Sequence, residues 1–173
     1  QHPGAEQLVQ QGIQCHFFDD IYEQAASFEE VYREIASFLI KASQKGPVIY
    51  AVPGHPLVGE KTVSLLLEEC RQQGIAIQIL PGMSFLDSLL IGTSLDPLNG
   101  LNIVDGLAME KINPLLPLVV MQVYDPLVAS RVKLSLMEHY PDDHRIKILS
   151  CLGLPQEEIK EIPLFELDQG TSF

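Results

Sequence analysis

The chain has 173 residues, of which 46% are hydrophobic and 20% charged, and its formal net charge is −12. A chain of this size and composition buries roughly two-thirds of its unfolded surface, which excludes a disordered or fibrous protein. No stretch reaches the roughly 20 apolar residues of a membrane-spanning helix, and the N-terminal residues do not resemble an export signal. We therefore expect a soluble protein without a membrane partner.

The charge balance and the cysteines limit the possible partners, metal sites and cellular location of the protein. The chain has 11 Lys and Arg residues against 23 Asp and Glu residues, with no basic run. A surface this negative repels phosphate backbones, so we expect no DNA partner. Cys15, Cys70 and Cys151 lie far apart, without the spacing of a disulfide framework or a zinc site. We predict a cytoplasmic location, no metal site, and core packing for Cys15 and Cys70.

Short apolar runs alternate with amphipathic segments, which is typical of a mainly parallel sheet covered by helices. Residues 13–18 are predicted to form the first strand. Ser27 and Glu30 then have the spacing of a capping box, which indicates a helix over residues 28–45. The apolar stripe expected on this helix consists of Phe28, Val31, Tyr32, Ile35, Phe38 and Leu39.

Two strand-and-turn units follow this helix. Residues 47–52 are strand formers with little polar character, as in a strand buried on both faces, and residues 75–80 repeat the pattern. A helix over residues 58–73 is predicted between them, and Gly74 is placed to end it in a left-handed conformation. Each strand is followed by a Pro-Gly pair, Pro53-Gly54 after the first and Pro81-Gly82 after the second.

A domain boundary is predicted where Asn113, Pro114 and Pro117 punctuate the chain. This boundary divides the chain into domains 1–113 and 114–173. Before it we predict a helix over residues 83–91 and a strand over 101–104; after it, strands over 118–123, 146–150 and 159–165 and a helix over 127–139.

The two Pro-Gly turns are the strongest indication of a site. Turns directly after parallel strands put backbone amides and bare glycine at the carboxyl edge of a sheet, where ligands bind in this architecture. A turn after a strand is also ordinary chain punctuation. Spacing alone therefore leaves a ligand site and a structural turn both open.

Several segments resemble the tetrapyrrole (corrin/porphyrin) methylases, which bind S-adenosylmethionine. The segment Tyr50-Ala51-Val52-Pro53-Gly54-His55-Pro56-Leu57-Val58 is similar to the Gly-Asp-Pro loop of that family, and Leu80-Pro81-Gly82-Met83-Ser84 is similar to its Pro-Gly-Ile-Ser element. The match is closest to the methylase-like N-terminal domain of YabN-type proteins, in which that domain is fused to a MazG nucleotide pyrophosphohydrolase. The other matching segments are Phe18-Asp19-Asp20-Ile21-Tyr22, Gln122-Val123-Tyr124-Asp125, Val132-Lys133-Leu134 and Tyr140-Pro141-Asp142-Asp143.

The resemblance implies the α/β tetrapyrrole methylase fold, with two α/β domains, a cofactor cleft between them and a homodimeric assembly. Residues 1–113 would form the N-terminal Rossmann-like domain and residues 114–173 the C-terminal α/β domain. The family's first strand and Gly-rich loop have no counterpart in this sequence, so we expect the first domain to be truncated at its start.

The cofactor implied by the resemblance is S-adenosylmethionine, and its expected contacts follow the matching motifs. His55 stands where most members of the family carry Asp, which exchanges a fixed acceptor for a titratable group. The implied cofactor-binding residues are Pro53, Gly54, His55, Val58, Ser84, Phe85, Gln122 and Gly153.

Methyl transfer from a sulfonium mainly requires a nucleophile held in line, and a base is needed if the acceptor is a hydroxyl or amine. The candidate bases are Asp19, Asp20, Tyr124 and Asp125. The leading hypothesis is an S-adenosylmethionine-dependent methyltransferase with a small-molecule or tetrapyrrole-like acceptor. The alternative is a non-catalytic ligand-binding or dimerisation module attached to a MazG nucleoside triphosphate pyrophosphohydrolase beyond Phe173.

Other chemistry-bearing residues receive no role. The acidic segment of residues 157–161 is expected to form a solvated strand edge, because prolines at positions 155 and 163 bracket it and no second acidic pair follows on a helix. The histidines without metal-ligand spacing are His2, His16, His139 and His144.

Overall fold

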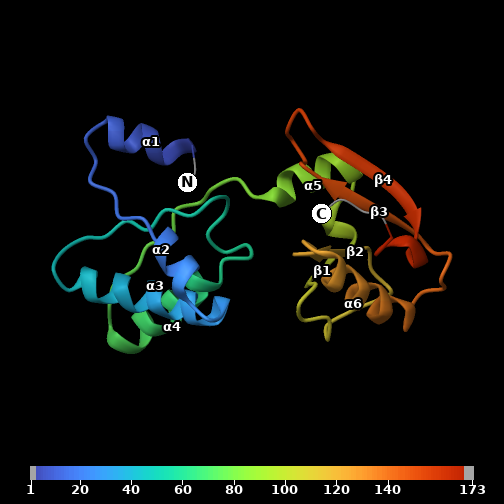
Figure 1. Ribbon diagram of the computed structural model, residues 1–173, viewed down its shortest axis with the longest axis horizontal. Coiled ribbons are helices and arrows are strands. Elements are labelled where there is room, and N and C mark those ends of the chain that lie inside the picture. Colours follow the sequence, from blue (N-terminus) through green and yellow to red (C-terminus); the bar gives the residue numbers. More distant parts are fainter. Residues whose placement is uncertain (1–2, 170–173) are drawn as a thin grey trace. The chain divides into compact units, whose positions relative to one another are not determined.

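The computed structural model describes residues 3–169 and divides the chain into two compact units, residues 1–84 and 85–173 (Figure 1). The predicted domain boundary after Asn113 stays a prediction. His2 and Phe173, both named in the sequence analysis, lie outside the described residues. The first unit contains α1 (Pro3–Gln10), α2 (Asp19–Gln24), α3 (Phe28–Ser43) and α4 (Lys61–Gln73). The second contains α5 (Phe85–Thr93), η1 (Pro97–Asn99), β1 (Asn102–Asp105), β2 (Leu118–Met121), α6 (Pro126–Met137), β3 (Arg145–Ser150), β4 (Glu158–Pro163) and η2 (Leu164–Glu166).

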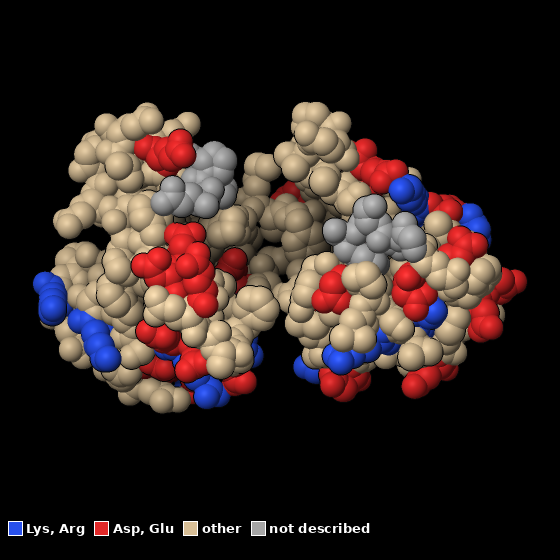
Figure 2. All heavy atoms as spheres, in the orientation of Figure 1, with Lys and Arg blue, Asp and Glu red and all other residues tan. Residues whose placement is uncertain are grey.

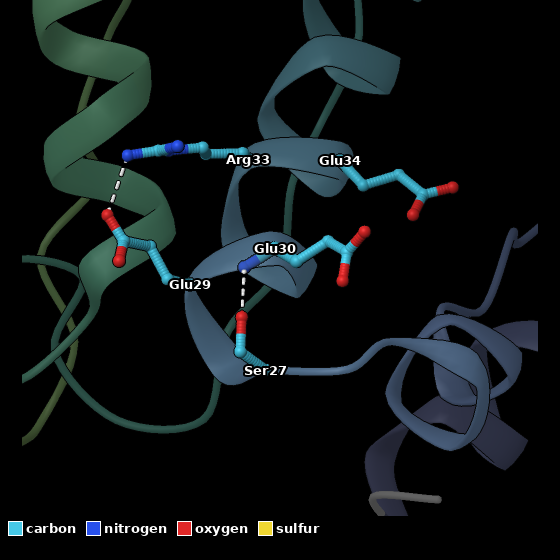
Figure 3. A pocket seen from close by; sticks show the side chains of 5 residues that line it. All are labelled: Ser27, Glu29, Glu30, Arg33 and Glu34. Atoms are coloured by element: carbon cyan, nitrogen blue, oxygen red, sulfur yellow. Dashed lines mark hydrogen bonds and ion pairs between the residues drawn. The ribbon is translucent and has the colours of Figure 1, made fainter.

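The predicted capping box at the start of α3 is confirmed (Figure 3). The Ser27 hydroxyl oxygen accepts a hydrogen bond from the Glu30 backbone N–H at 3.3 Å, and the Glu30 carboxylate accepts one from the Ala26 N–H at 3.0 Å. One turn further, Arg33 pairs with Glu29 at 2.6 Å. The Ser27 and Glu30 contacts satisfy backbone donors that a helix start otherwise leaves to water.

Helices α3 and α4 pack together and form the core of the first unit. The buried residues of this core are Val31, Ile35, Ala36, Leu39, Ile40, Leu66 and Cys70. Phe28 and Phe38, predicted on the buried stripe, are 60% and 41% exposed, because Phe28 is the first residue of the helix and Phe38 turns outward to stack on His16. Cys70 packs in the core as predicted, whereas Cys15 is only half-buried.

The strands predicted over residues 13–18, 47–52 and 75–80 do not form among the described residues of the first unit. Strand propensity reports how side chains suit a pleated surface, whereas a strand also needs a neighbouring backbone in register. Tyr50 and Ile75 instead anchor their segments on the α3–α4 core, and Gly74 ends α4 in the predicted left-handed conformation, with φ +67°.

In the described part of the second unit, the strands form two small sheets, and each of these strands matches a predicted one. β1 and β2 pair in parallel, with Val104 opposite Val120. β3 and β4 pair antiparallel, with Ile148 opposite Lys160. The core around α6 buries Val128, Ala129, Val132, Leu136, Leu164 and Leu167.

The capping box generates a prediction about stability. Ser27→Ala removes the hydroxyl acceptor at the start of α3, so we expect the free energy of unfolding to fall by about 1 kcal/mol in urea titrations. Ser37→Ala, within the same helix, is the matched control and is expected to leave stability unchanged or to raise it slightly, because Ala has the higher helix propensity. Equal losses in both variants would contradict the assigned role of Ser27.

Candidate functional site

The two Pro-Gly loops predicted from the sequence meet in the first unit. A methyl group added at Gly82 would lie 2.8 Å from the carbonyl oxygen of Gly54, closer than real side chains approach a backbone. Gly54 has φ +84°, a conformation that favours glycine, and a methyl group there would lie 3.6 Å from the Met83 carbonyl oxygen. The two loops are therefore in backbone contact, and this contact requires glycine at position 82.

His55 is held by its own loop. Its Nδ1 accepts a hydrogen bond from the Leu57 N–H at 3.1 Å, and its carbonyl oxygen accepts one from the Val58 N–H at 3.0 Å. A neutral imidazole that accepts at Nδ1 carries its proton on Nε2, so His55 presents an N–H donor from that nitrogen. His55 and Val58 are both half-buried.

The remaining predicted cofactor contacts divide between the two units. Pro53 is exposed and Ser84 half-buried in the first unit, whereas Phe85 begins α5 in the second. Within the second unit, Phe85 and Gln122 line the same cavity, while a methyl group added at Gly153 would lie 2.9 Å from the Ser88 hydroxyl oxygen on α5.

Gln122 adopts a backbone conformation that the sequence did not predict. Its φ of +59° falls in the left-handed region, which costs a residue other than glycine of order 1–3 kcal/mol and occurs often at functional sites. Cys151, shortly after β3, has φ +52°. Two strained residues thus follow strands of the second unit, at β2 and β3.

The candidate bases occupy different settings. Asp125 caps α6, because its carboxylate accepts a hydrogen bond from the Val128 N–H at 2.8 Å. Asp19 and Asp20 are exposed in the first turn of α2, over which acidic side chains gather on the face drawn in Figure 2. Tyr124 is 52% exposed. A structural role is therefore already assigned to Asp125, and the other three remain candidates.

A group of acidic side chains beside the first loop was not predicted. Burial raises the pKa of the Glu60 carboxyl. Burial also raises the pKa of Tyr50, with smaller increases from Glu60 and Tyr22, while a hydrogen bond with the buried Thr62 lowers it. The pKa of Tyr22 is raised in turn by burial and by the neighbouring acidic groups. Glu60 occupies the N-cap position of α4, whereas the predicted helix already began at residue 58, so no signal in the sequence marked this residue.

The described residues also bear on two other classes of site, a metal site and a membrane-spanning helix. Within residues 3–169, no three His, Cys, Asp or Glu side chains group so that they could hold a metal ion. No helix in that range is long and apolar enough to cross a membrane. The acidic segment of residues 157–161, predicted as a strand edge, overlaps the first part of β4. The surface hollow drawn in Figure 3 is lined by the acidic start of α3.

Comparisons of the sequence give a family match and a curated relative. The model of the family described as Tetrapyrrole (Corrin/Porphyrin) Methylases matches residues 1–168. A relative from Bacillus subtilis (strain 168), called uncharacterized protein YabN, is 43% identical over 173 residues, which are 99% of this chain and 35% of the relative. The chain thus spans about a third of the length of that relative.

Comparisons of the structure show its fold. Uroporphyrin-III-C-methyltransferase from Thermus thermophilus is similar with a TM-score of 0.57 and 19% identity, over 79% of this chain and 66% of that chain. The same enzyme complexed with S-adenyl homocysteine has a TM-score of 0.58 and 18% identity, over 83% of this chain and 67% of that chain. A cobalt precorrin-4 methyltransferase has a TM-score of 0.53 and 12% identity, over 84% and 65% of the two chains. The chain therefore has the α/β fold of these methyltransferases.

The raised pKa of Glu60 predicts a pH dependence of stability. Between the usual pKa of a glutamate and the raised value, the folded state binds more protons than the unfolded state, so stability falls as pH rises through this window. Glu60→Gln removes this loss and is expected to stabilise the chain above the window by less than about 1 kcal/mol, because solvent reaches the carboxyl.

Urea unfolding across the acidic range measures this effect. Glu34→Gln, on the exposed face of α3, is the matched control and should retain the pH slope of the parent. A Glu60→Gln variant with an unchanged slope would refute the assignment.

Proposed function

Because the chain belongs to the tetrapyrrole (corrin/porphyrin) methylase family, we propose that it is a methyltransferase that binds S-adenosylmethionine at the two Pro-Gly loops of its first unit. The observation that carries this proposal is the backbone contact between Gly54 and Gly82. A surface without side chains lets a ligand approach main-chain donors and acceptors closely. A similar Thermus thermophilus enzyme is complexed with S-adenyl homocysteine, the product that remains after methyl transfer.

Each loop residue has a distinct part in the proposed site. Pro53 and Gly54 provide the turn and the open backbone, and His55 provides an N–H donor from Nε2. Val58 provides apolar contact, and Ser84 follows the second Pro-Gly pair. Phe85, Gln122 and Gly153 remain cofactor contacts predicted from the family resemblance.

The bound cofactor supplies a methyl group on a positively charged sulfur. The chain has then to hold the acceptor's nucleophile close and in line and to exclude water. If the nucleophile is a hydroxyl or an amine, a base must take its proton. Glu60 suits this role because its raised pKa makes it a stronger base than an ordinary glutamate, and Asp19, Asp20 and Tyr124 remain alternatives.

The proposed acceptor is a small molecule of the tetrapyrrole type. Two of the similar structures are methyltransferases named for uroporphyrin-III and for cobalt precorrin-4. The net charge of −12 opposes an RNA acceptor, because the phosphate backbone would be repelled. The proposal also includes a homodimeric assembly and a cytoplasmic location. The three free cysteines are consistent with that location.

A second candidate function is a non-catalytic ligand-binding or dimerisation module attached to a MazG nucleoside triphosphate pyrophosphohydrolase. It is favoured by one observation, namely that the chain spans 35% of its curated relative. Such a module need not bind S-adenosylmethionine, whereas a methyltransferase must. Cofactor binding therefore separates the two candidates.

Calorimetric titration of S-adenosylhomocysteine into the full-length product of the gene tests the proposal. We expect binding of micromolar strength, about −8 kcal/mol, in the parent protein. Gly54→Val and His55→Trp are each expected to weaken binding by at least about tenfold, because both fill the loop surface. Gly54→Val also strains the left-handed turn.

Two control variants distinguish loss of the site from loss of stability. Gly12→Ala also strains a left-handed residue, with φ +79°, but the added methyl group meets no atom within 4 Å, so binding should persist. His139→Trp places the same indole at an exposed histidine beyond α6 and should also leave binding unchanged. Failure of the parent protein to bind would overturn the methyltransferase proposal in favour of the attached module.

A further inference from the structure

The loop between the antiparallel strands β3 and β4, residues 151–157, consists of two consecutive turns (Figure 1). In the first turn, the Cys151 carbonyl oxygen accepts a hydrogen bond from the Leu154 N–H at 3.0 Å. In the second, the Leu154 carbonyl oxygen accepts one from the Glu157 N–H at 2.9 Å. Both bonds join residues three apart, as in β-turns, and the two turns share Leu154.

The residue types of this loop suit the two turns. Gly153 is the third residue of the first turn and has φ +76°, a conformation that this position of a type II turn requires and that glycine adopts without strain. Pro155 is the second residue of the second turn, where its fixed φ is favoured. Cys151, in contrast, has φ +52°, which is strained for a residue other than glycine. Such strain persists only where the surrounding contacts hold the backbone.

The Glu157 side chain joins the two turns. Its Oε2 accepts a hydrogen bond from the Gly153 N–H at 2.7 Å, a short distance that is typical of a carboxylate acceptor. Glu157 is thus attached to the loop through its backbone, which bonds to Leu154, and through its side chain. The sequence placed Glu157 on a solvated strand edge, whereas in the structure it precedes β4 and bonds within the loop.

The peptide groups on both sides of Gly153 are therefore fixed. The Gly153 N–H belongs to the group before this residue, and Glu157 holds it. The Leu154 N–H belongs to the group after Gly153, and Cys151 holds it. Because a peptide group is planar, a bond to its N–H also directs its carbonyl oxygen. Glu157 thus supplies one of the two bonds that determine the backbone direction at a residue with large conformational freedom.

Helix α5 holds the first turn from another side. A methyl group added at Gly153 would lie 2.9 Å from the Ser88 hydroxyl oxygen, and one added at Gly92 would lie 3.4 Å from the Leu152 side chain. Ser88 and Gly92 are about one helical turn apart on α5. The helix therefore packs closely on Leu152 and Gly153, and the Glu157 carboxylate holds the same turn from within the loop.

We propose that Glu157 is a positioning residue for the cofactor, because its carboxylate holds the backbone of Gly153 in the conformation that meets S-adenosylmethionine. This inference rests on the proposed function, in which Gly153 is a cofactor contact. Glu157 acts through Gly153 and does not itself touch the cofactor. A turn that is already ordered loses little further conformational freedom on binding, so loss of this hydrogen bond weakens binding.

Calorimetric titration of S-adenosylhomocysteine into the full-length product of the gene tests this role. The probe has no charge on its sulfur, so removal of a negative side chain does not change an attraction to a sulfonium. Glu157→Ala is expected to bind about fivefold more weakly than the parent protein, which is the effect of one lost hydrogen bond. Glu157→Gln keeps a side-chain oxygen that accepts the Gly153 N–H and should bind like the parent. Parent-like binding by Glu157→Ala would overturn the proposal.

Glu158→Ala is the matched control. It removes the same charge from the next residue, whose carboxylate pairs with Lys160 at 3.1 Å on the exposed surface of β4. Exposed ion pairs contribute little to stability, so binding by this variant should match the parent. Equal weakening in Glu157→Ala and Glu158→Ala would assign the effect to charge alone and overturn the proposal.

Urea unfolding of the same samples separates positioning from stability. Glu157 is exposed, so all three variants are expected to stay folded. A lower free energy of unfolding in Glu157→Ala together with unchanged binding would assign the hydrogen bond to the stability of the strand pair alone. That result would also overturn the proposal.

Hydrogen exchange in the ligand-free protein tests the bond independently of the cofactor. The Gly153 N–H should exchange slowly in the parent and in Glu157→Gln, and at least about tenfold faster in Glu157→Ala. Equal exchange in all three would overturn the inference while leaving the proposed function intact. Failure of the parent protein to bind S-adenosylhomocysteine would instead overturn the proposed function, and the positioning role would fall with it.

Discussion

The close approach of two backbone segments at Gly54 and Gly82 is the constraint on which the candidate site depends. Any side chain at position 82 would place a carbon 2.8 Å from the Gly54 carbonyl oxygen. The approach is set by the helical core, because the segments before the two loops pack against α3 and α4 through Tyr50 and Ile75. The loops are thus positioned by side-chain packing, without a strand ladder between them among the described residues of that unit.

This arrangement links packing to the proposed chemistry. A loop held by packing can present bare backbone to a ligand without first ordering itself, which lowers the entropic cost of binding. His55 is preorganised in the same way by the bonds to Leu57 and Val58. In the same unit, burial raises the pKa values of Glu60 and Tyr50, and the charge of Glu60 adds to the increase at Tyr50.

The features that could be predicted from the sequence are those with local causes. The Ser27 capping box and the left-handed Gly74 each depend on a few neighbouring residues, and both are confirmed. The two Pro-Gly loops were predicted as turns after strands; the loops do meet at Gly54 and Gly82, but the strands before them do not form among the described residues. The helices over the four predicted segments also form, within a few residues of the predicted ends.

The features that could not be predicted depend on partners distant in the chain. Residues 13–18, 47–52 and 75–80 have strand composition, but pairing requires a second backbone that composition does not specify. The same holds for Glu60, which becomes partly buried only in the folded chain, and for the strain at Gln122. The separate pairing of β2 and β3 likewise appears only in three dimensions.

A crystal structure of the full-length gene product with S-adenosylhomocysteine would test the central claim most directly. The account predicts that the ligand lies against the backbone of Gly54 and Gly82 and accepts a hydrogen bond from Nε2 of His55. A ligand bound with these two loops untouched would contradict it, because the contact between the loops would then be a structural turn alone.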